Sequence, residues 1–91
     1  MYIVRIVRVL IESRIQEKLA KKHGVSRKEV EAALVEGHPL FFRARGGRYV
    51  AFARGERQLT IIFTYRRGIA TVHTAYPSSD WQIRLYRRRH P

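Results

Sequence analysis

RYVAFARGERQLTIIFTYRRGIATVHTAY, residues 48–76, is the stretch that decides the fold. Side chains alternate along residues 58–65, so that one set faces one way (Leu59, Ile61, Phe63, Tyr65) and the other set faces the opposite way (Gln58, Thr60, Ile62, Thr64). Gly55 and Gly68 stand where hairpin turns need a residue that tolerates positive φ. The stretch therefore predicts three antiparallel β-strands with one face of the sheet on a core.

Arginine dominates this half of the chain. Residues 43–91 carry eleven Arg and no Lys against Glu56 and Asp80, a net charge of +9 within a total of +12. Such a field concentrates polyanions, and the guanidinium group suits bidentate phosphate contacts and stacking on bases. Charge carried for solubility alone would not need one sign or one half of the chain. The composition favours nucleic acid as the partner over an anionic membrane surface.

Length and composition exclude several classes of protein. A chain of 91 residues predicts a single domain spanning residues 1–91. The absence of Cys excludes disulfides and thiolate metal sites, and the four His show no metal-ligand spacing. No apolar run reaches the roughly 20 residues of a membrane span, and the N-terminus is a poor signal peptide. No nucleotide-binding or metalloprotease motif is present. We expect a cytoplasmic protein without a membrane, metal or cofactor.

Working outward toward the N-terminus, an apolar β-branched run predicts a strand near Val4–Ile11 at or near the sheet edge. Capping boxes at Ser13 with Gln16 and at Ser26 with Glu29 predict helices at 14–23 and 27–36. Gly24 ends the first helix and Gly37 with Pro39 ends the second. Residues 40–42 form either a short strand or a buried connection.

Toward the C-terminus, Ser79 with Gln82 makes a third capping box and predicts a helix at 80–88, packed by Trp81 and Leu85. The predicted order is β-α-α-β-β-β-α. This is an α+β domain in which a helical hairpin packs on one side of an antiparallel sheet.

Lys22-His23-Gly24-Val25-Ser26, at the turn between the first two helices, resembles the BrnT toxin family. In that family a first strand and helix lead into a K-H-G-V-S segment, a second helix, a glycine-bounded meander and a C-terminal helix. The resemblance covers roughly residues 7–88 and implies the RelE/ParE toxin superfold, whose small basic members pair with an antitoxin. Most studied relatives cut mRNA, some on the ribosome, whereas the ParE branch poisons DNA gyrase.

The chain also departs from the family pattern. Gly47 stands where an acidic residue usually precedes an Arg-aromatic pair, which is Arg48-Tyr49 here. Thr71 and Tyr76 replace two Arg of the last strand, and Ile11-Glu12 replaces a Trp-Asp pair. The resemblance therefore carries a catalytic role only to Arg48.

RNA cleavage by attack of the 2′-hydroxyl needs a base, cations that stabilise the phosphorane, and an acid, but no metal. Arg48 is the candidate cation, and His73 is the candidate acid or base because histidine exchanges protons near neutrality. Glu56 is the remaining catalytic candidate, as the only carboxylate of the meander. The alternatives are a strand histidine that only packs and a solvated turn carboxylate.

Further side chains are candidates for nucleic-acid contact. Arg48 and Arg54 share a strand face with Val50 and Phe52, which is either a core face with arginines at its ends or a groove floor on which Phe52 stacks bases. The remaining candidates are Arg57, Arg66, Arg67, Tyr76, Tyr86, Arg87, Arg88 and Arg89. Each tyrosine has the alternative of packing at the edge of the core.

The sequence leads to one hypothesis and two rivals. The hypothesis is the toxin of a type II toxin–antitoxin pair, a metal-independent endoribonuclease that acts on mRNA and is held by an acidic antitoxin. The rivals are a non-catalytic basic RNA-binding module and a ParE-like inhibitor of gyrase. The oligomeric state stays open, a dimer included.

Overall fold

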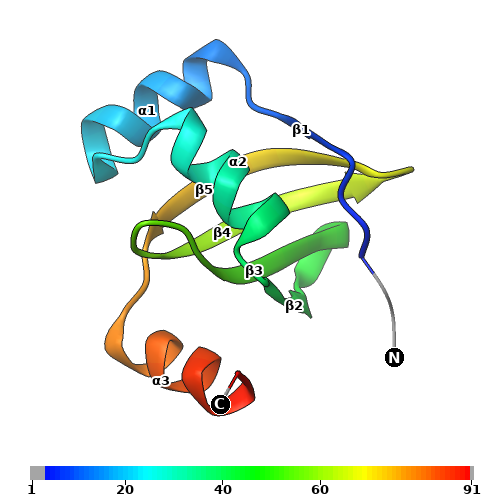
Figure 1. The fold of residues 1–91 in the computed structure, drawn as a ribbon. Helices are drawn as coiled ribbons and strands as arrows, with labels where there is room; N and C mark the ends of the chain where they lie inside the picture. Colours follow the sequence, from blue (N-terminus) through cyan, green and yellow to red (C-terminus); the bar gives the residue numbers. More distant parts are fainter. Residues whose placement is uncertain (1–3, 91) are drawn as a thin grey trace.

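The computed structural model describes residues 4–90, which fold into a five-stranded sheet with three α-helices (Figure 1). The elements are β1 (Arg8–Leu10), α1 (Ser13–His23), α2 (Arg27–Glu36), β2 (Leu40–Arg43), the short 3-10 helix η1 (Arg45–Gly47), β3 (Arg48–Arg54), β4 (Gln58–Arg66), β5 (Ile69–Pro77) and α3 (Asp80–Arg89). The sheet order is β1-β5-β4-β3-β2. The predicted α+β fold is confirmed, and residues 40–43 form a strand.

The meander forms as the alternation predicts, with β3, β4 and β5 paired antiparallel. β2 extends the sheet antiparallel to β3, whereas β1 closes the other edge and runs parallel to β5. Gly68 has φ of 82° in the β4–β5 turn, which explains why glycine stands there. The positive φ predicted at Gly55 is wrong, since Gly55 does not have positive φ. In the β4–β5 turn, Arg67 beside Gly68 has positive φ as well, at 49°.

The two N-terminal helices begin in different ways. α2 has the predicted capping box, in which Ser26 Oγ accepts from the Glu29 backbone N–H and Glu29 Oε2 accepts from the Ser26 N–H. The box predicted at Ser13 is wrong because the helix begins one residue earlier, with Glu12 as its N-cap. The Gln16 amide instead donates to the Ile11 carbonyl at 3.0 Å, so it ties the first turn to the end of β1.

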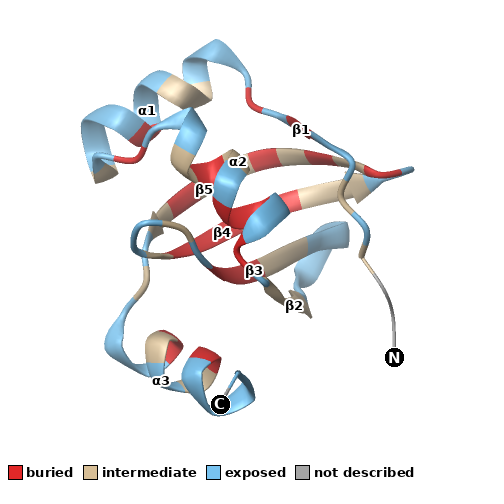
Figure 2. Cartoon of the chain, viewed as in Figure 1, coloured by how far each residue is buried: buried red, intermediate tan, exposed pale blue. Residues whose placement is uncertain are grey.

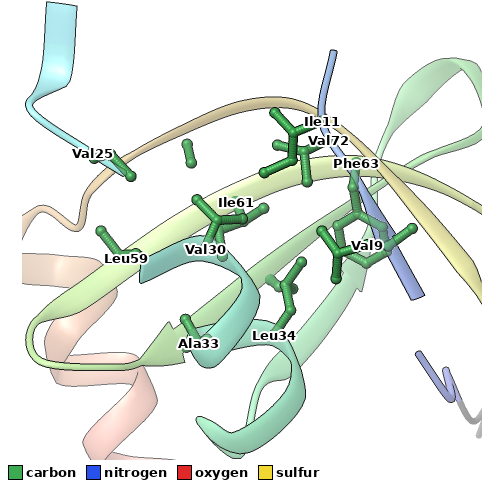
Figure 3. Close-up of a cluster of buried hydrophobic side chains, with 14 of the residues drawn as sticks. Val9, Ile11, Val25, Val30, Ala33, Leu34, Leu59, Ile61, Phe63 and Val72 are labelled. Atoms are coloured by element: carbon green, nitrogen blue, oxygen red, sulfur yellow. The ribbon is translucent and has the colours of Figure 1, made fainter. Parts of the chain in front are cut away.

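The helical hairpin of α1 and α2 covers one face of the sheet. The main core lies between this hairpin and the sheet (Figure 3). Leu59, Ile61 and Phe63 of β4 are fully buried there, as the alternation predicts. The core also takes in residues from both helices and from the other strands: Val9, Ile11, Leu19, Val25, Val30, Ala33, Leu34, Ala51, Ala53, Ala70, Val72 and Ala75. Figure 2 shows this burial along the middle of the sheet behind α2.

α3 packs on the opposite face and is fixed at both ends. At its start, Ser79 and Gln82 form the predicted capping box, and Gln82 Oε1 also accepts from the Thr60 hydroxyl at 2.8 Å. Near its end, the Tyr86 hydroxyl donates to the Gly37 carbonyl at 2.8 Å. The predicted packing by Trp81 is wrong in part, because Trp81 is 57% exposed while Gln82 and Tyr86 are buried.

Gly37 joins three elements through its backbone. Its N–H donates to the Ala33 carbonyl, and its carbonyl accepts from the Arg54 N–H and the Tyr86 hydroxyl. A Cβ at this position would lie 2.4 Å from the Ala33 oxygen and 2.6 Å from the Arg54 oxygen. The close approach of two backbone segments therefore requires glycine here.

None of the helices in residues 4–90 is both long and apolar enough to cross a membrane.

Candidate nucleic-acid interface

The face of the sheet opposite the helical hairpin divides into a covered half and an open half. Under α3, Phe52 is 3% exposed and Thr60 is fully buried. Farther along the same strands, Thr64 and His73 are half-buried and Arg48 is exposed. We call this second region the open face, and its members are Arg48, Thr64, Arg66, Thr71 and His73. It is the part of the sheet where polar side chains reach solvent from several adjacent strands.

Strand register places the members of the open face in one row. Arg48 of β3 pairs with Thr64 of β4, and Thr64 pairs with Thr71 of β5. Directly opposite residues in antiparallel strands point to the same face with Cβ atoms about 4.5–5.5 Å apart. Arg66, two residues beyond Thr64, points to the same face. A guanidinium and two hydroxyls therefore stand side by side.

His73 joins this row through a β-bulge. Ile62 pairs with Thr74 and Phe63 pairs with Val72, so His73 is the extra residue that has no partner across the strand. Its Nε2 lies 3.2 Å from the Thr64 hydroxyl. His73 stands two residues from Thr71 on β5 and therefore faces the same side of the sheet as Arg48, so the structure brings together two of the three predicted catalytic residues.

Two hollows flank the open face. One, of about 280 Å³, is bordered by Thr64, Thr71 and the two arginines of the β4–β5 turn, Arg66 and Arg67. The other, of about 290 Å³, lies between the sheet and α3, and we call it the aromatic pocket; its walls include Phe42, Phe52, Tyr76, Trp81, Gln82 and Leu85. Cations therefore border the first hollow and rings border the second.

Glu56 and Arg57 lie elsewhere. Both are in the β3–β4 turn, which is six residues of β4 away from Thr64, roughly 20 Å along an extended strand. Arg57 donates to both oxygens of Glu29 and to the Gly24 carbonyl, which ties the turn to the helical hairpin. The Arg57 guanidinium holds the pKa of Glu29 below its ordinary value, and Glu29 raises the pKa of Arg57 in return.

The remaining predicted contact residues lie around α3. Arg54 sits at the end of β3 beside Tyr86, and burial raises the pKa of that tyrosine although the Arg54 charge opposes the shift. Tyr86 is buried and stacked on His90, so its ring belongs to the packing of α3. Tyr76 lines the aromatic pocket with its ring 6.0 Å from that of His23. The exposed last turn of α3 carries Arg87, Arg88 and Arg89.

Sequence reasoning did not single out Thr64, and it named Thr71 only as a departure from the family pattern. The alternation did place Thr64 on the face away from the core, but nothing in it shows that the register puts this threonine beside Arg48. The bulge at His73 leaves no local signal either, since it depends on pairing with β4. Within residues 4–90, no group of three His, Cys, Asp or Glu side chains is placed to hold a metal ion.

Fold and open face together define a class: a small, strongly basic α+β domain with an exposed sheet face of arginine, threonine and histidine. Among solved structures, the chain is similar to the 1.1 Å crystal structure of the Brucella abortus ribonuclease toxin BrnT. The TM-score is 0.66 at 17% sequence identity, over 80% of this chain and 97% of that chain. The protein therefore has a BrnT-like fold, as the K-H-G-V-S resemblance implied. No protein-family model and no curated protein sequence matches the chain.

Proposed function

We propose that this protein is a metal-independent endoribonuclease, the toxin of a type II toxin–antitoxin pair that acts on mRNA in the cytoplasm. The observation that carries the proposal is the open face, where Arg48, Thr64 and His73 come together from three strands. The net charge of +12 and the fold shared with a ribonuclease toxin support it. The reaction class is attack of a ribose 2′-hydroxyl on the adjacent phosphate.

Each residue of this group has a chemical role in that reaction. Arg48 offers two N–H groups to the phosphate oxygens on which negative charge grows in the transition state. Thr64 holds the Nε2 side of the His73 ring, which leaves Nδ1 as the nitrogen that exchanges a proton with the substrate. Arg66 and Arg67 border the adjoining hollow and provide for the neighbouring phosphate.

A non-catalytic RNA-binding module is the second candidate, and one observation favours it. Among the described residues, the Thr64 hydroxyl is the hydrogen-bond partner of the His73 ring, and no carboxylate is paired with it. Cleavage needs both an acid and a base, so His73 would have to fill the two roles in turn or share them with water. Binding through arginine and stacking needs neither role.

Cleavage of a defined single-stranded RNA in excess chelator tests the proposal, because metal-dependent nucleases are then silent. We expect the wild-type protein to cut and Arg48→Ala to cut on the order of 10²–10³ more slowly, which is the usual loss when an oxyanion donor is removed. Arg14→Ala is the matched control, since Arg14 is an exposed arginine on α1, whose side chain is 85% accessible.

His73→Gln, which keeps size and polarity, separates the candidates. If His73→Gln slows RNA cleavage as much as Arg48→Ala does, His73 transfers the proton. If it slows cleavage only slightly, His73 has a packing role. RNA that binds but stays whole, alone and with ribosomes, favours the RNA-binding module. Loss of plasmid supercoiling without RNA cleavage would instead favour the gyrase-directed inhibitor.

The partner in this proposal is an acidic antitoxin that covers the open face and neutralises its charge. Co-expression with the product of an adjacent gene should give a stable complex that no longer binds RNA. If every adjacent product fails to bind and the protein is harmless on its own, the toxin–antitoxin part of the proposal fails.

A further inference from the structure

The aromatic pocket is the feature of this face that the proposed chemistry does not use. Phe52 forms its floor, with the Phe42 ring centroid at 5.1 Å and the Trp81 ring centroid at 5.8 Å. Trp81 meets Phe52 edge to face, at 83°, and is still 57% exposed. A large aromatic ring is thus held at the pocket mouth with most of its surface uncovered, beside the rings of Phe42 and Phe52, so it is accessible to a ligand.

The pocket is already formed in this structure. Gln82 Oε1 accepts from the Thr60 hydroxyl and from the Ser79 N–H, both at 2.8 Å, which fixes the start of α3 to β4. The bond from Tyr86 to the Gly37 carbonyl fixes the end of the same helix. A ligand therefore does not have to order the helix on binding, and this lowers the entropic cost of association.

Size and surroundings indicate what fits. The volume of about 290 Å³ lies at the lower end for small-molecule pockets, which are roughly 300–1,000 Å³, so the pocket suits a single ring system. Val50 also lines it and stands two residues from Arg48 on β3, about 6.6 Å along the strand. On α3, Arg84 and Arg88 follow Trp81 at i+3 and i+7, which places cations on the same side of the helix.

We propose that the aromatic pocket is a nucleobase subsite, in which a base of single-stranded RNA stacks on Trp81 while its phosphate is held at Arg48. A nucleotide joins a flat ring to an anion one ribose away, and here an aromatic pocket reaches along β3 to Val50, two residues from the Arg48 guanidinium. An apolar side chain of a protein partner could occupy the pocket, but it would leave the neighbouring arginines without a partner, whereas a nucleotide uses both. The inference rests on the proposed RNA substrate, and it adds a subsite for the base next to the phosphate that is cut.

Trp81 is the only tryptophan of the chain, so its fluorescence reports on the subsite directly. The probe is a short single-stranded RNA with 2′-O-methyl groups, which binds but cannot be cut, and its matched control is an abasic strand of equal length and charge. We expect the RNA to quench Trp81 and the abasic strand to leave it unchanged. We also expect the abasic strand to bind roughly 5- to 150-fold more weakly, the loss that corresponds to one stacked base.

Variants separate stacking from simple apolar contact. By anisotropy of a labelled RNA, Trp81→Phe should keep most of the affinity and Trp81→Leu should lose it, because leucine retains bulk but not a ring face. Val35→Ala is the control, since Val35 is also 57% exposed but lies on α2. Near-unchanged circular dichroism of Trp81→Leu shows that the fold is intact.

The outcomes distinguish this inference from the function on which it rests. RNA that is bound and cut without quenching of Trp81, or with equal affinity for the abasic strand, overturns the subsite and leaves the nuclease. Quenching without any cutting supports the subsite and removes the nuclease. If the co-expressed protein partner quenches Trp81 fluorescence and RNA does not, the pocket binds a protein and the proposal is overturned.

Discussion

The two faces of the sheet are built from the same strands and differ in almost every physical property. On the helical-hairpin side, consecutive inward positions of β4 are fully buried leucine, isoleucine and phenylalanine. On the other side, the ten-residue helix α3 covers one half, and Thr64, Thr71 and His73 remain half-buried in the other. The difference is one of coverage: two helices seal one face of the sheet, and a single short helix leaves half of the other face open to solvent, where the proposed site lies.

Ile61 and Ile62 give the most direct test of this division, because the same residue type occupies adjacent positions on opposite faces. Ile61 is fully buried in the core, whereas Ile62 is half-buried on the α3 side. We expect Ile61→Ala to cost about 2–5 kcal/mol of unfolding free energy, from lost burial and a cavity, and Ile62→Ala about 1 kcal/mol. Urea unfolding of the two variants measures the difference. Equal losses would show that the α3 side is as much a core as the hairpin side.

A smaller effect, on the salt dependence of RNA binding, is expected from removing cations from the α3 side or from the hairpin side of the sheet. Replacing Arg87, Arg88 and Arg89 of α3 by Gln should reduce the slope of log affinity against log salt by about 2, since each phosphate contact on a single strand contributes about 0.7. Replacing Lys18, Lys21 and Lys22 of α1 removes the same charge from the hairpin side and should change the slope far less. Similar changes in both variants would mean that RNA contacts both sides.

The bond between Thr64 and His73 should contribute less again. Thr64→Val keeps the shape of the side chain but removes the hydroxyl that lies 3.2 Å from Nε2, so the imidazole loses its orientation. We expect RNA cleavage to slow by roughly 2- to 10-fold, in line with one hydrogen bond of about 0.5–1.5 kcal/mol. RNA affinity should not change. A weaker affinity with an unchanged rate for bound RNA would assign Thr64 to binding instead.

The smallest effect concerns the ion pair that fastens the hairpin side. The pKa of Glu29 is lowered in the folded protein, so its contribution is complete above the ordinary value of 4.5 and is lost as the pH falls through the lowered value. Glu29→Gln keeps the capping box but not the charge, and should cost about 0.5–1 kcal/mol near neutrality and nothing at low pH. Unfolding measured from pH 7 to pH 3 tests this, with Glu17→Gln on α1 as the control.

Patterns that are local in sequence predicted the fold well. The capping boxes of α2 and α3 fixed both helix starts, because each needs only residues three apart. The alternation in residues 58–65 separated the faces of β4 correctly. The Ser13 prediction failed because the helix begins one residue earlier, with Glu12 as an N-cap that makes no side-chain cap bond, and the S-x-x-Q motif does not show this.

The site was predicted only in part because it depends on pairing between strands. Arg48 and His73 were expected from their residue types, but their meeting depends on the register of β4 with both β3 and β5, which places Thr64 beside each of them. Arg57 was predicted from its charge to contact phosphate, but in the structure its guanidinium pairs with Glu29, 28 residues away in the sequence. Trp81 was expected to pack from the spacing of apolar residues in the helix, but its ring meets Phe52 only edge to face and 57% of the residue stays exposed.

The pairing of β1 with β5 has a consequence for how the chain reaches this state. Thr64 and His73 are nine residues apart and meet when the β4–β5 hairpin forms, a local and fast event. The contact that anchors the β1 segment joins Tyr65 to the Arg5 carbonyl, 60 residues apart, and contacts at that separation form late because loop closure must come first. We therefore expect the residues of the open face to come together before β1 closes the sheet. In that interval β5 would be an unpaired edge strand, so we expect slower docking of β1 to increase aggregation during folding.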